Sequence, residues 1–203
     1  MELFLIRHGR TMAMPDKICC GRTDVALSPE GIAQLKAMKE AGGYPDLTGL
    51  HVYTSGMKRT EQTLAALYGP VAHDVLKDFR EIDFGDLEGQ VIIDAASCDW
   101  MVRTRGDHAL AFPHGESWDQ VLARAYASVN ELLDRNEDAL VVTHGGITGM
   151  LVADLFPERY GQGTAEGLRA LHCGCGFHVT FRAGVAVAVT GLPDTADFTE
   201  AML

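Results

Sequence analysis

The chain has 203 residues, of which 47% are hydrophobic, so it is long enough for one domain with a sizeable buried core. Its formal net charge of -11 disfavours nucleic acid and anionic membranes as partners, and it contains no run of lysines or arginines that would bind them locally. Five cysteines, an odd number, are typical of reduced thiols, and Arg7 interrupts the first apolar run too early for a signal peptide. We therefore expect a cytoplasmic protein without a membrane span.

Alternating strand-like and helix-like patterns predict an α/β fold with a mostly parallel sheet. A short apolar strand at residues 3–9 opens the chain, and Ser28 is the expected N-cap of a helix over residues 28–43. The first half of the chain continues with a strand at 51–55, a helix at 56–70 with Ser55 near its cap, a short extended piece at 71–76 and an acidic turn at 80–89.

The second half follows the same alternation after an irregular insertion at about residues 85–115, within one domain spanning 1–203. Ser117 and Gln120 form a capping box at the start of a helix whose apolar residues keep helical spacing. A buried strand at 139–146, a helix at 147–156 and a C-terminal antiparallel hairpin at 177–190 complete the expected elements.

Two of these strands deliver the same dipeptide, His-Gly, at their carboxyl ends. LIRHG ends in His8 and Gly9, and VVTHG ends in His144 and Gly145. Ligands of open parallel sheets lie outside the carboxyl ends of the strands, so neighbouring strands would bring both imidazoles to one pocket. Arg59 lies in the first turn of a helix, where side chains lean toward the N-terminus and an anion is favoured.

Arg7, Arg59 and the two histidines together favour a phosphate dianion as ligand. Arginine offers a planar donor fork that matches phosphate oxygens, and imidazole can act as a nucleophile when neutral or as a donor when protonated. The acidic turn REIDFGDLEG supplies a carboxyl group for proton transfer to the leaving oxygen. Spacing alone leaves open which of its four carboxyl groups faces the pocket, those of Glu81, Asp83, Asp86 and Glu88, with Asp83 as the main rival of Glu81.

Six segments, in order, resemble the histidine phosphatase superfamily, in the branch that contains cofactor-dependent phosphoglycerate mutases and small phosphatases. The segments are RHGRT, CGRTDVALSPEG, TSGMKRTEQT, REIDFGDLEG, PHGES and VTHGG. The resemblance implies a three-layer α/β/α sandwich and phosphoryl transfer through a covalent phosphohistidine, without a metal or another cofactor. REIDFGDLEG and PHGES look closer to phosphatases of the α-ribazole-phosphate and broad-specificity type.

Carried over position by position, the resemblance assigns a role to each residue of the core. His8 looks like the phosphorylated nucleophile, and Arg7 and Arg59 look like phosphate clamps. Glu81 looks like the proton donor and acceptor, and His144 looks like the residue that stabilises the transferring phosphoryl group.

Three departures from the mutase pattern favour hydrolysis over mutase chemistry. Met14 occupies the position of an asparagine usual in the mutases, their His-Gly-Asn becomes His-Gly-Gly, and their paired arginines have no clear counterpart, although Arg103 and Arg105 lie nearby in sequence. These differences remove side chains that would bind a second phosphate or carboxylate. The expected function is a phosphomonoester hydrolase acting on a small phosphorylated metabolite. A phosphoglycerate mutase and a non-catalytic phospho-ligand-binding module remain the alternatives. The oligomeric state stays open, with a homodimer as a candidate.

Two further groups of residues have weaker sequence signals. Four residues are candidates for the mouth of the pocket, with a place in a solvated loop as the alternative: Arg10, Cys20, Gly21 and Arg22. HCGCGFH at residues 172–178 contains two thiols and two imidazoles, but zinc sites usually space paired cysteines by at least two residues. We therefore expect the two cysteines of this segment to be buried or loop thiols, with a metal site as the alternative.

Overall fold

The computed structural model describes residues 1–92, 98–160 and 172–193, and its centre is a six-stranded sheet in the order β3-β2-β4-β1-β5-β6. Strands β3, β2, β4 and β1 are parallel, whereas β5 is antiparallel to β1 and forms an antiparallel hairpin with β6. This confirms the predicted α/β fold with a C-terminal hairpin. The strands are β1 (Glu2–Arg7), β2 (His51–Thr54), β3 (Asp74–Val75), β4 (Ala139–Thr143), β5 (Gly176–Arg182) and β6 (Val185–Leu192).

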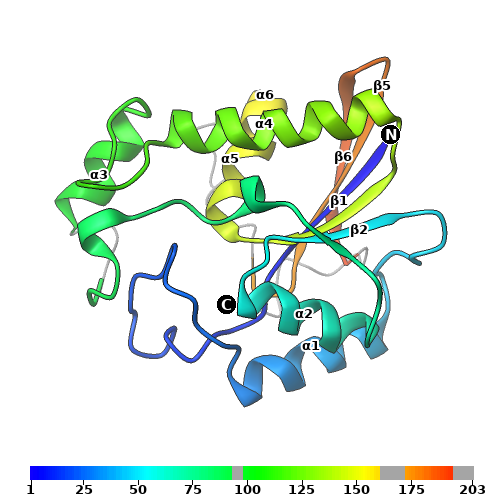
Figure 1. Ribbon diagram of the computed structural model, residues 1–203, viewed down its shortest axis with the longest axis horizontal. Helices are drawn as coiled ribbons and strands as arrows, with labels where there is room; N and C mark the ends of the chain where they lie inside the picture. The colour runs from blue at the N-terminus through cyan, green and yellow to red at the C-terminus, as the bar shows by residue number, and fades with distance from the viewer. Residues whose placement is uncertain (93–97, 161–171, 194–203) are drawn as a thin grey trace.

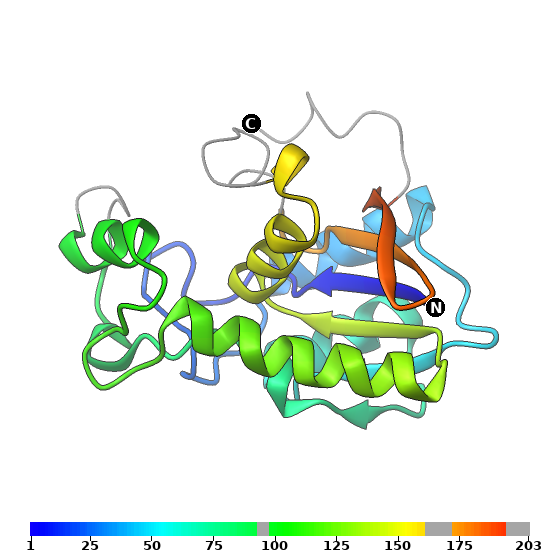
Figure 2. The same ribbon diagram turned by 90° about the horizontal axis from the view of Figure 1, so that it is seen from above.

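Helices cover both faces of the sheet, as Figures 1 and 2 show. Helices α1 and α2 lie together on one face, and α4 and α5 pack together on the other, which gives three layers. The helices are α1 (Pro29–Ala41), α2 (Lys58–Tyr68), α3 (Asp99–Gly106), α4 (Trp118–Arg135), α5 (Gly145–Leu155) and α6 (Pro157–Tyr160), with 3₁₀ turns η1 (Lys77–Phe79) and η2 (Gly85–Leu87).

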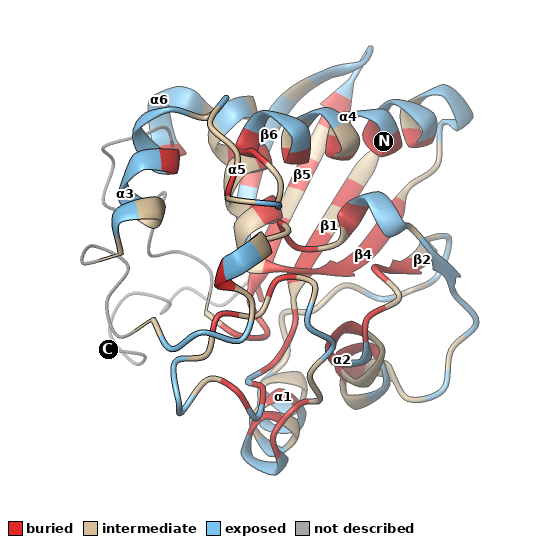
Figure 3. Ribbon diagram, turned by 60° about the vertical axis from the view of Figure 1, so that its left-hand side comes forward, coloured by how far each residue is buried: buried red, intermediate tan, exposed pale blue. Residues whose placement is uncertain are grey.

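The central strands are apolar on both faces because both faces are covered. All five residues of β4 are buried, which makes this strand continuously red in Figure 3. Val141 packs into the core beneath α4 and α5, whereas Leu140 and Val142 pack into the separate core beneath α1 and α2. Leu5 and Ile6 of β1 divide in the same way between the two cores.

The predicted side-chain caps are present at the N-termini of two helices, whereas a third helix has none. The hydroxyl of Ser28 accepts a hydrogen bond from the Gly31 N–H, and Ser117 and Gln120 form the predicted capping box. Helix α2, however, begins at Lys58 with Met57 as its N-cap and no side-chain cap, so Ser55 lies near this helix start without capping it. The Ser55 hydroxyl has a different partner, a histidine at the sheet edge.

The segment at 85–115 is less irregular than expected, because it contains η2 and helix α3. The sequence gives α3 little signal: it has no side-chain N-cap, and its buried residue is the polar Thr104. Residues 93–97 of this segment lie outside the described ranges. Within those ranges, no helix is both long enough and apolar enough to cross a membrane.

Candidate active site

The register of β1 and β4 brings the two His-Gly dipeptides together. Arg7 is the partner of Thr143 in this parallel pair, so His8 and His144 leave the sheet side by side. The His8 N–H donates to the Thr143 carbonyl at 2.9 Å. The two imidazole rings lie with their centroids 5.2 Å apart and their planes at 63°. Both histidines are therefore neighbours at the carboxyl edge of the sheet, as their positions in sequence predict.

His8 is buried and has one ring nitrogen engaged by the backbone. Its Nδ1 lies 2.7 Å from the Gly9 carbonyl, which can only accept, so Nδ1 carries a proton in that bond. Burial and the positive charges of Arg7 and Arg59 hold the pKa of His8 well below its ordinary value. The imidazole is therefore neutral near pH 7, with the lone pair on Nε2 available as a nucleophile.

His144 is also fully buried, but both of its ring nitrogens have partners. Arg59 Nε donates to His144 Nδ1 at 3.1 Å, so the proton of the neutral ring resides on Nε2. Nε2 then donates to the Ser55 hydroxyl at 2.8 Å, and that hydroxyl can donate to Thr60, 3.0 Å away. Burial and neighbouring charges, chiefly that of Arg59, lower the pKa of His144 well below its ordinary value.

Arg59 is buried at the centre of the site, with 1% of its surface exposed. Besides His144, its guanidinium donates to the Gly21 carbonyl at 2.7 Å and to the Thr23 carbonyl at 2.9 Å. These three bonds occupy three of the five N–H groups of a guanidinium. The described contacts thus leave two N–H groups that could donate to a phosphoryl oxygen.

Arg7 reaches the same edge from the end of β1. A Cβ atom at residue 145 would lie 3.0 Å from Arg7 Nε, so the absence of a side chain at Gly145 makes room for the arginine. The charge of Arg7 contributes to the lowered pKa of His8. Arg7 and Arg59 therefore both act electrostatically on the histidine expected to be the nucleophile.

Glu81 lies at the N-terminus of α5, immediately beyond His144. Its carboxylate accepts hydrogen bonds from the N–H groups of Gly146 at 2.9 Å and Ile147 at 3.2 Å. A Cβ atom at residue 146 would come within 2.5 Å of the Glu81 carboxylate. Both glycines therefore make room for protein side chains, Gly145 for Arg7 and Gly146 for Glu81.

The rival carboxyl group, that of Asp83, is directed elsewhere. One of its oxygens accepts from the Gly85 N–H at 2.9 Å, and the other lies 4.0 Å from Arg22 Nε. Backbone carbonyls around Glu81 are held by Arg124 of α4, which donates to Arg80 at 2.6 Å and to Glu81 at 3.1 Å. Of the two candidates, Glu81 is thus the one placed beside the histidine pair.

The four candidate mouth residues take different positions. Gly21 is buried and contacts Arg59 through its carbonyl, whereas Cys20 is partly buried beside it. Arg22 pairs with Glu116 at 3.1 Å, and Arg10 is exposed. Four further residues take part in the site without having been predicted from sequence: Ser55, Thr23, Glu88 and Arg124. Of these, Ser55 had a signal in sequence, as a candidate near a helix start, whereas Glu88 was one acid among four in its turn.

The run at 172–178 gains no support as a metal site. Cys173 and Cys175 are buried, and His178 pairs with Glu2 at 2.7 Å and stacks on Phe4. Across the described part of the chain, no three His, Cys, Asp or Glu side chains are grouped so that they could hold a metal ion.

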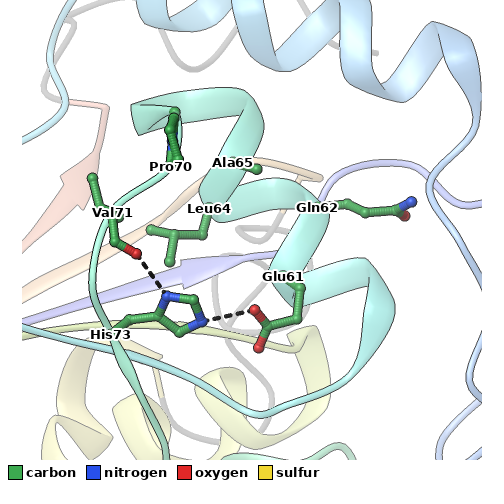
Figure 4. Close-up of a pocket in the computed structure, with 8 residues that line it drawn as sticks. Glu61, Gln62, Leu64, Ala65, Pro70, Val71 and His73 are labelled. Atoms are coloured by element: carbon green, nitrogen blue, oxygen red, sulfur yellow. Dashed lines mark hydrogen bonds and ion pairs between the residues drawn. The ribbon is translucent and has the colours of Figure 1, made fainter.

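A cavity of about 330 Å³ lies apart from the histidine pair, between α2 and the segment that follows it. Figure 4 shows His73 directed between Glu61, 2.7 Å away, and the Val71 carbonyl, 3.0 Å away. None of the residues predicted for the functional site lines this cavity, which is formed by Glu61, Gln62, Leu64, Ala65, Gly69, Pro70, Val71 and His73.

Curated proteins are similar to this chain over most of its length. Human 6-phosphofructo-2-kinase/fructose-2,6-bisphosphatase 4 is 30% identical over 176 residues, which cover 85% of this chain but 35% of that protein, so the chain spans about a third of this relative. Phosphoglycerate mutase-like protein 4 of Arabidopsis thaliana is 29% identical over 72% of this chain and 67% of its own.

Solved structures resemble this fold along most of its length. A phosphoglycerate mutase from Thermus thermophilus superposes with a TM-score of 0.70 at 26% identity, covering 93% of this chain and 98% of that one. A mycobacterial glucosyl-3-phosphoglycerate phosphatase gives a TM-score of 0.68 at 26% identity, covering 88% of this chain and 92% of that one. The family model of the histidine phosphatase superfamily (branch 1) matches residues 3–175. With its two histidines at adjoining strand ends, the chain belongs to the histidine phosphatase superfamily, branch 1.

Proposed function

We propose that this chain is a phosphomonoester hydrolase that works through a phosphohistidine formed on His8. The observation that carries the proposal is the environment of His8, which is buried between two arginines and bonded through Nδ1 to a backbone carbonyl. Its Nδ1–H is held by the Gly9 carbonyl, and the lowered pKa keeps the ring neutral, so Nε2 presents a lone pair at neutral pH. A buried neutral imidazole between two arginines suits nucleophilic attack on a phosphate ester.

In the first step, His8 Nε2 attacks phosphorus in line with the ester oxygen. The P–N bond forms as the P–O bond breaks, and the protonated Glu81 carboxyl gives its proton to the leaving oxygen. The products are an alcohol and the phosphoenzyme.

In the second step, water attacks the phosphohistidine on phosphorus. The P–N bond breaks, the Glu81 carboxylate takes a proton from the water, and inorganic phosphate leaves. Glu81 ends the cycle protonated and His8 neutral, so the cycle balances without a metal or an added cofactor.

Arg7 and Arg59 stabilise the charge on the equatorial phosphoryl oxygens. In this arrangement His144 contributes mainly by orienting Arg59, because both of its nitrogens are engaged. Direct donation from His144 Nδ1 to the phosphoryl group would require the bond from Arg59 Nε to open and Nδ1 to gain a proton. Preorganised charges of this kind supply most of the catalysis in phosphoryl transfer.

Two features favour hydrolysis over mutase chemistry. A side chain at residue 146, where the mutases resembled here carry asparagine, would collide with Glu81. Met14 replaces a second asparagine, and its sulfur lies 3.6 Å from the thiol of Cys173. The site therefore offers no amide at either position to retain a phosphorylated product against water.

The substrate class that we propose is a small phosphorylated metabolite, handled by a single domain acting as a monomer or homodimer in the cytoplasm. α-Ribazole phosphate is a candidate because of the REIDFGDLEG and PHGES segments. The names of similar proteins add glucosyl-3-phosphoglycerate and fructose 2,6-bisphosphate. Phosphate release from a panel of these esters, with sugar phosphates and phosphoglycerates, would rank them by kcat/KM.

Hydrolysis of p-nitrophenyl phosphate in the presence of EDTA tests the proposal. We expect turnover by the natural chain and none by His8→Ala. Failure of the natural chain to release phosphate from this or any panel ester would favour a phospho-ligand-binding module. With 3-phosphoglycerate and a trace of bisphosphate, isomer formation in excess of free phosphate would instead favour a mutase.

A further inference from the structure

The carboxylate of Glu88 gathers a set of backbone N–H groups from a distant loop. Its oxygens accept from the N–H groups of Gly21 at 2.9 Å, Arg22 at 2.8 Å and Thr23 at 3.0 Å. The Thr23 hydroxyl donates to the same carboxylate at 2.5 Å, and the Phe84 N–H lies 3.3 Å away. Three successive N–H groups thus converge on one internal anion, as in the backbone nests that bind anions elsewhere.

The carbonyl groups of the same loop face the active site. The carbonyls of Gly21 and Thr23 accept two of the hydrogen bonds donated by Arg59. The loop from Gly21 to Thr23 therefore lies between a carboxylate, which receives its N–H groups, and a guanidinium, which donates to its carbonyls. Arg59 in turn donates to His144, which completes a chain of contacts from Glu88 to the histidine pair.

We propose that Glu88 is a positioning residue for phosphoryl transfer, which acts through the Gly21–Thr23 loop to fix the guanidinium of Arg59 and, through it, the protonation of His144. This inference rests on the proposed hydrolase function for its kinetic consequence. The structural consequence, the orientation of Arg59 and the tautomer of His144, holds whatever ester is cleaved.

Glu88 suits this role because it stays ionised although it is partly buried. Burial opposes its ionisation, but hydrogen bonds from the Thr23 hydroxyl and from backbone N–H groups outweigh burial and lower the pKa below its ordinary value. The loop has little freedom to adjust in another way. A Cβ atom at Gly21 would lie 1.9 Å from the Ile82 carbonyl, so the backbone of the loop is pressed against the acidic turn.

Glu88→Gln is the variant that tests the role, because it keeps the volume and replaces one acceptor oxygen by an amide donor. That donor would face the converging N–H groups, so the loop must shift and Arg59 must lose part of its support. We expect kcat/KM for p-nitrophenyl phosphate to fall roughly 10- to 100-fold, as is usual for an ångström-scale displacement of a positioned group. Most of the loss should appear in kcat. Glu88→Asp, which keeps the charge, should recover part of it.

Glu2→Gln provides a matched control. Glu2 is also a carboxylate with several partners, since it accepts from Thr180 at 2.7 Å and from Arg182 at 2.8 Å and pairs with His178. It lies at the opposite end of β1 from His8. A general loss of stability would affect both variants, whereas the proposed role predicts a loss of kcat in Glu88→Gln alone.

A double-mutant cycle with Arg59→Lys separates positioning from a merely structural role. If Glu88 acts through Arg59, then Glu88→Gln should cost much less in the Arg59→Lys background than in the natural chain. Full additivity of the two losses would overturn the proposal. Should Glu88→Gln fail to fold, Thr23→Val removes one donor to the carboxylate, and the same cycle applies to its smaller loss.

Nitrogen-15 NMR of the histidine rings gives a readout that does not depend on activity. In the natural chain His144 should be the Nε2–H tautomer, and Glu88→Gln should shift it toward a mixture, while Glu2→Gln leaves it unchanged. An unchanged tautomer together with unchanged kcat in Glu88→Gln would reject the positioning role. A shifted tautomer in Glu88→Gln, with a natural chain that cleaves no phosphate ester, would support the positioning role and reject the hydrolase function.

Discussion

Arg59 Nε donates a hydrogen bond to His144 Nδ1 at 3.1 Å, and this contact fixes where the proton of a buried imidazole resides. The remaining ring proton must point from Nε2 to the hydroxyl of Ser55. Sequence motifs identify both the arginine and the histidine, but they do not reveal that the two are bonded to each other. The consequence is that His144 orients a phosphate-binding group as well as lying beside the nucleophile.

Ser55→Ala should weaken the site through this proton. The substitution leaves the Nε2–H of His144 buried without its acceptor, which costs about 1–3 kcal/mol of unfolding free energy. Because the tautomer and Arg59 are then less firmly held, we expect kcat to fall on the order of tenfold. Urea unfolding and steady-state kinetics measure the two effects. Ser128 is another buried serine, and its hydroxyl bonds to Asp78. Ser128→Ala should therefore leave kcat unchanged. Equal losses of kcat in both variants would refute the role of Ser55.

The pH dependence of kcat/KM should reflect the lowered pKa of His8. Burial, together with Arg7 and Arg59, holds this pKa well below the ordinary value of 6.5. The nucleophile is inactivated by protonation, and a depressed pKa moves that protonation to lower pH. The value of kcat/KM should thus persist as the pH falls through 6.5, and it should decline only at lower pH, where His8 becomes protonated. A decline centred at or above 6.5 that is assigned to His8 by NMR titration would contradict this expectation.

Gly146→Ala should damage catalysis by displacing Glu81. The added Cβ would lie 2.5 Å from a Glu81 carboxylate oxygen and 3.1 Å from the Trp118 ring, so the carboxylate must move. Overpacking of this kind costs roughly 1–3 kcal/mol, and we expect kcat to fall by about 10- to 100-fold. Gly191→Ala is the control, since its Cβ would meet nothing within 4 Å. Unchanged kcat in Gly146→Ala would show that Glu81 need not occupy this position.

Glu81→Gln should separate the two chemical steps. An activated ester such as p-nitrophenyl phosphate needs little protonation of its leaving group, so the phosphoenzyme can still form. Its hydrolysis should slow on the order of 10²- to 10⁴-fold, because glutamine cannot accept the proton of water. Rapid mixing would then show a burst of p-nitrophenol equivalent to the enzyme, followed by slow turnover.

Asp83→Asn provides the comparison for that experiment, because Asp83 is the rival carboxyl in sequence but bonds to Gly85. We expect turnover close to that of the natural chain. A burst in Asp83→Asn and none in Glu81→Gln would assign the proton transfer to Asp83, and would overturn the role of Glu81.

Much of the fold could be predicted because its determinants are local. The His-Gly strand ends, the Ser28 cap and the capping box at Ser117 are each encoded within a few residues. The proximity of His8 and His144 followed from parallel pairing, which the register of Arg7 with Thr143 confirms. Family motifs supplied the proposed roles of the core residues.

The remaining features depend on contacts between segments far apart in sequence. Ser55 precedes a helix and resembles a cap, but the course of the chain turns its hydroxyl toward His144, 89 positions away. Glu88 bonds to a loop 65 to 67 positions earlier, and nothing in the acidic turn distinguishes it from its neighbours. Helix α3 carries little apolar periodicity, so its formation could not be predicted from pattern.

The most direct test of the central claim is to map the phosphoryl group in Glu81→Gln after rapid quenching under alkaline conditions, which preserve phosphohistidine. Because Nδ1 of His8 donates to the Gly9 carbonyl, we predict one phosphoryl group per chain, on Nε2 of His8, and none in the His8→Ala/Glu81→Gln double variant. Phosphorylation on Nδ1 would contradict the tautomer assigned to His8. Sustained turnover by His8→Ala, with no phosphohistidine anywhere in the chain, would contradict the mechanism as a whole.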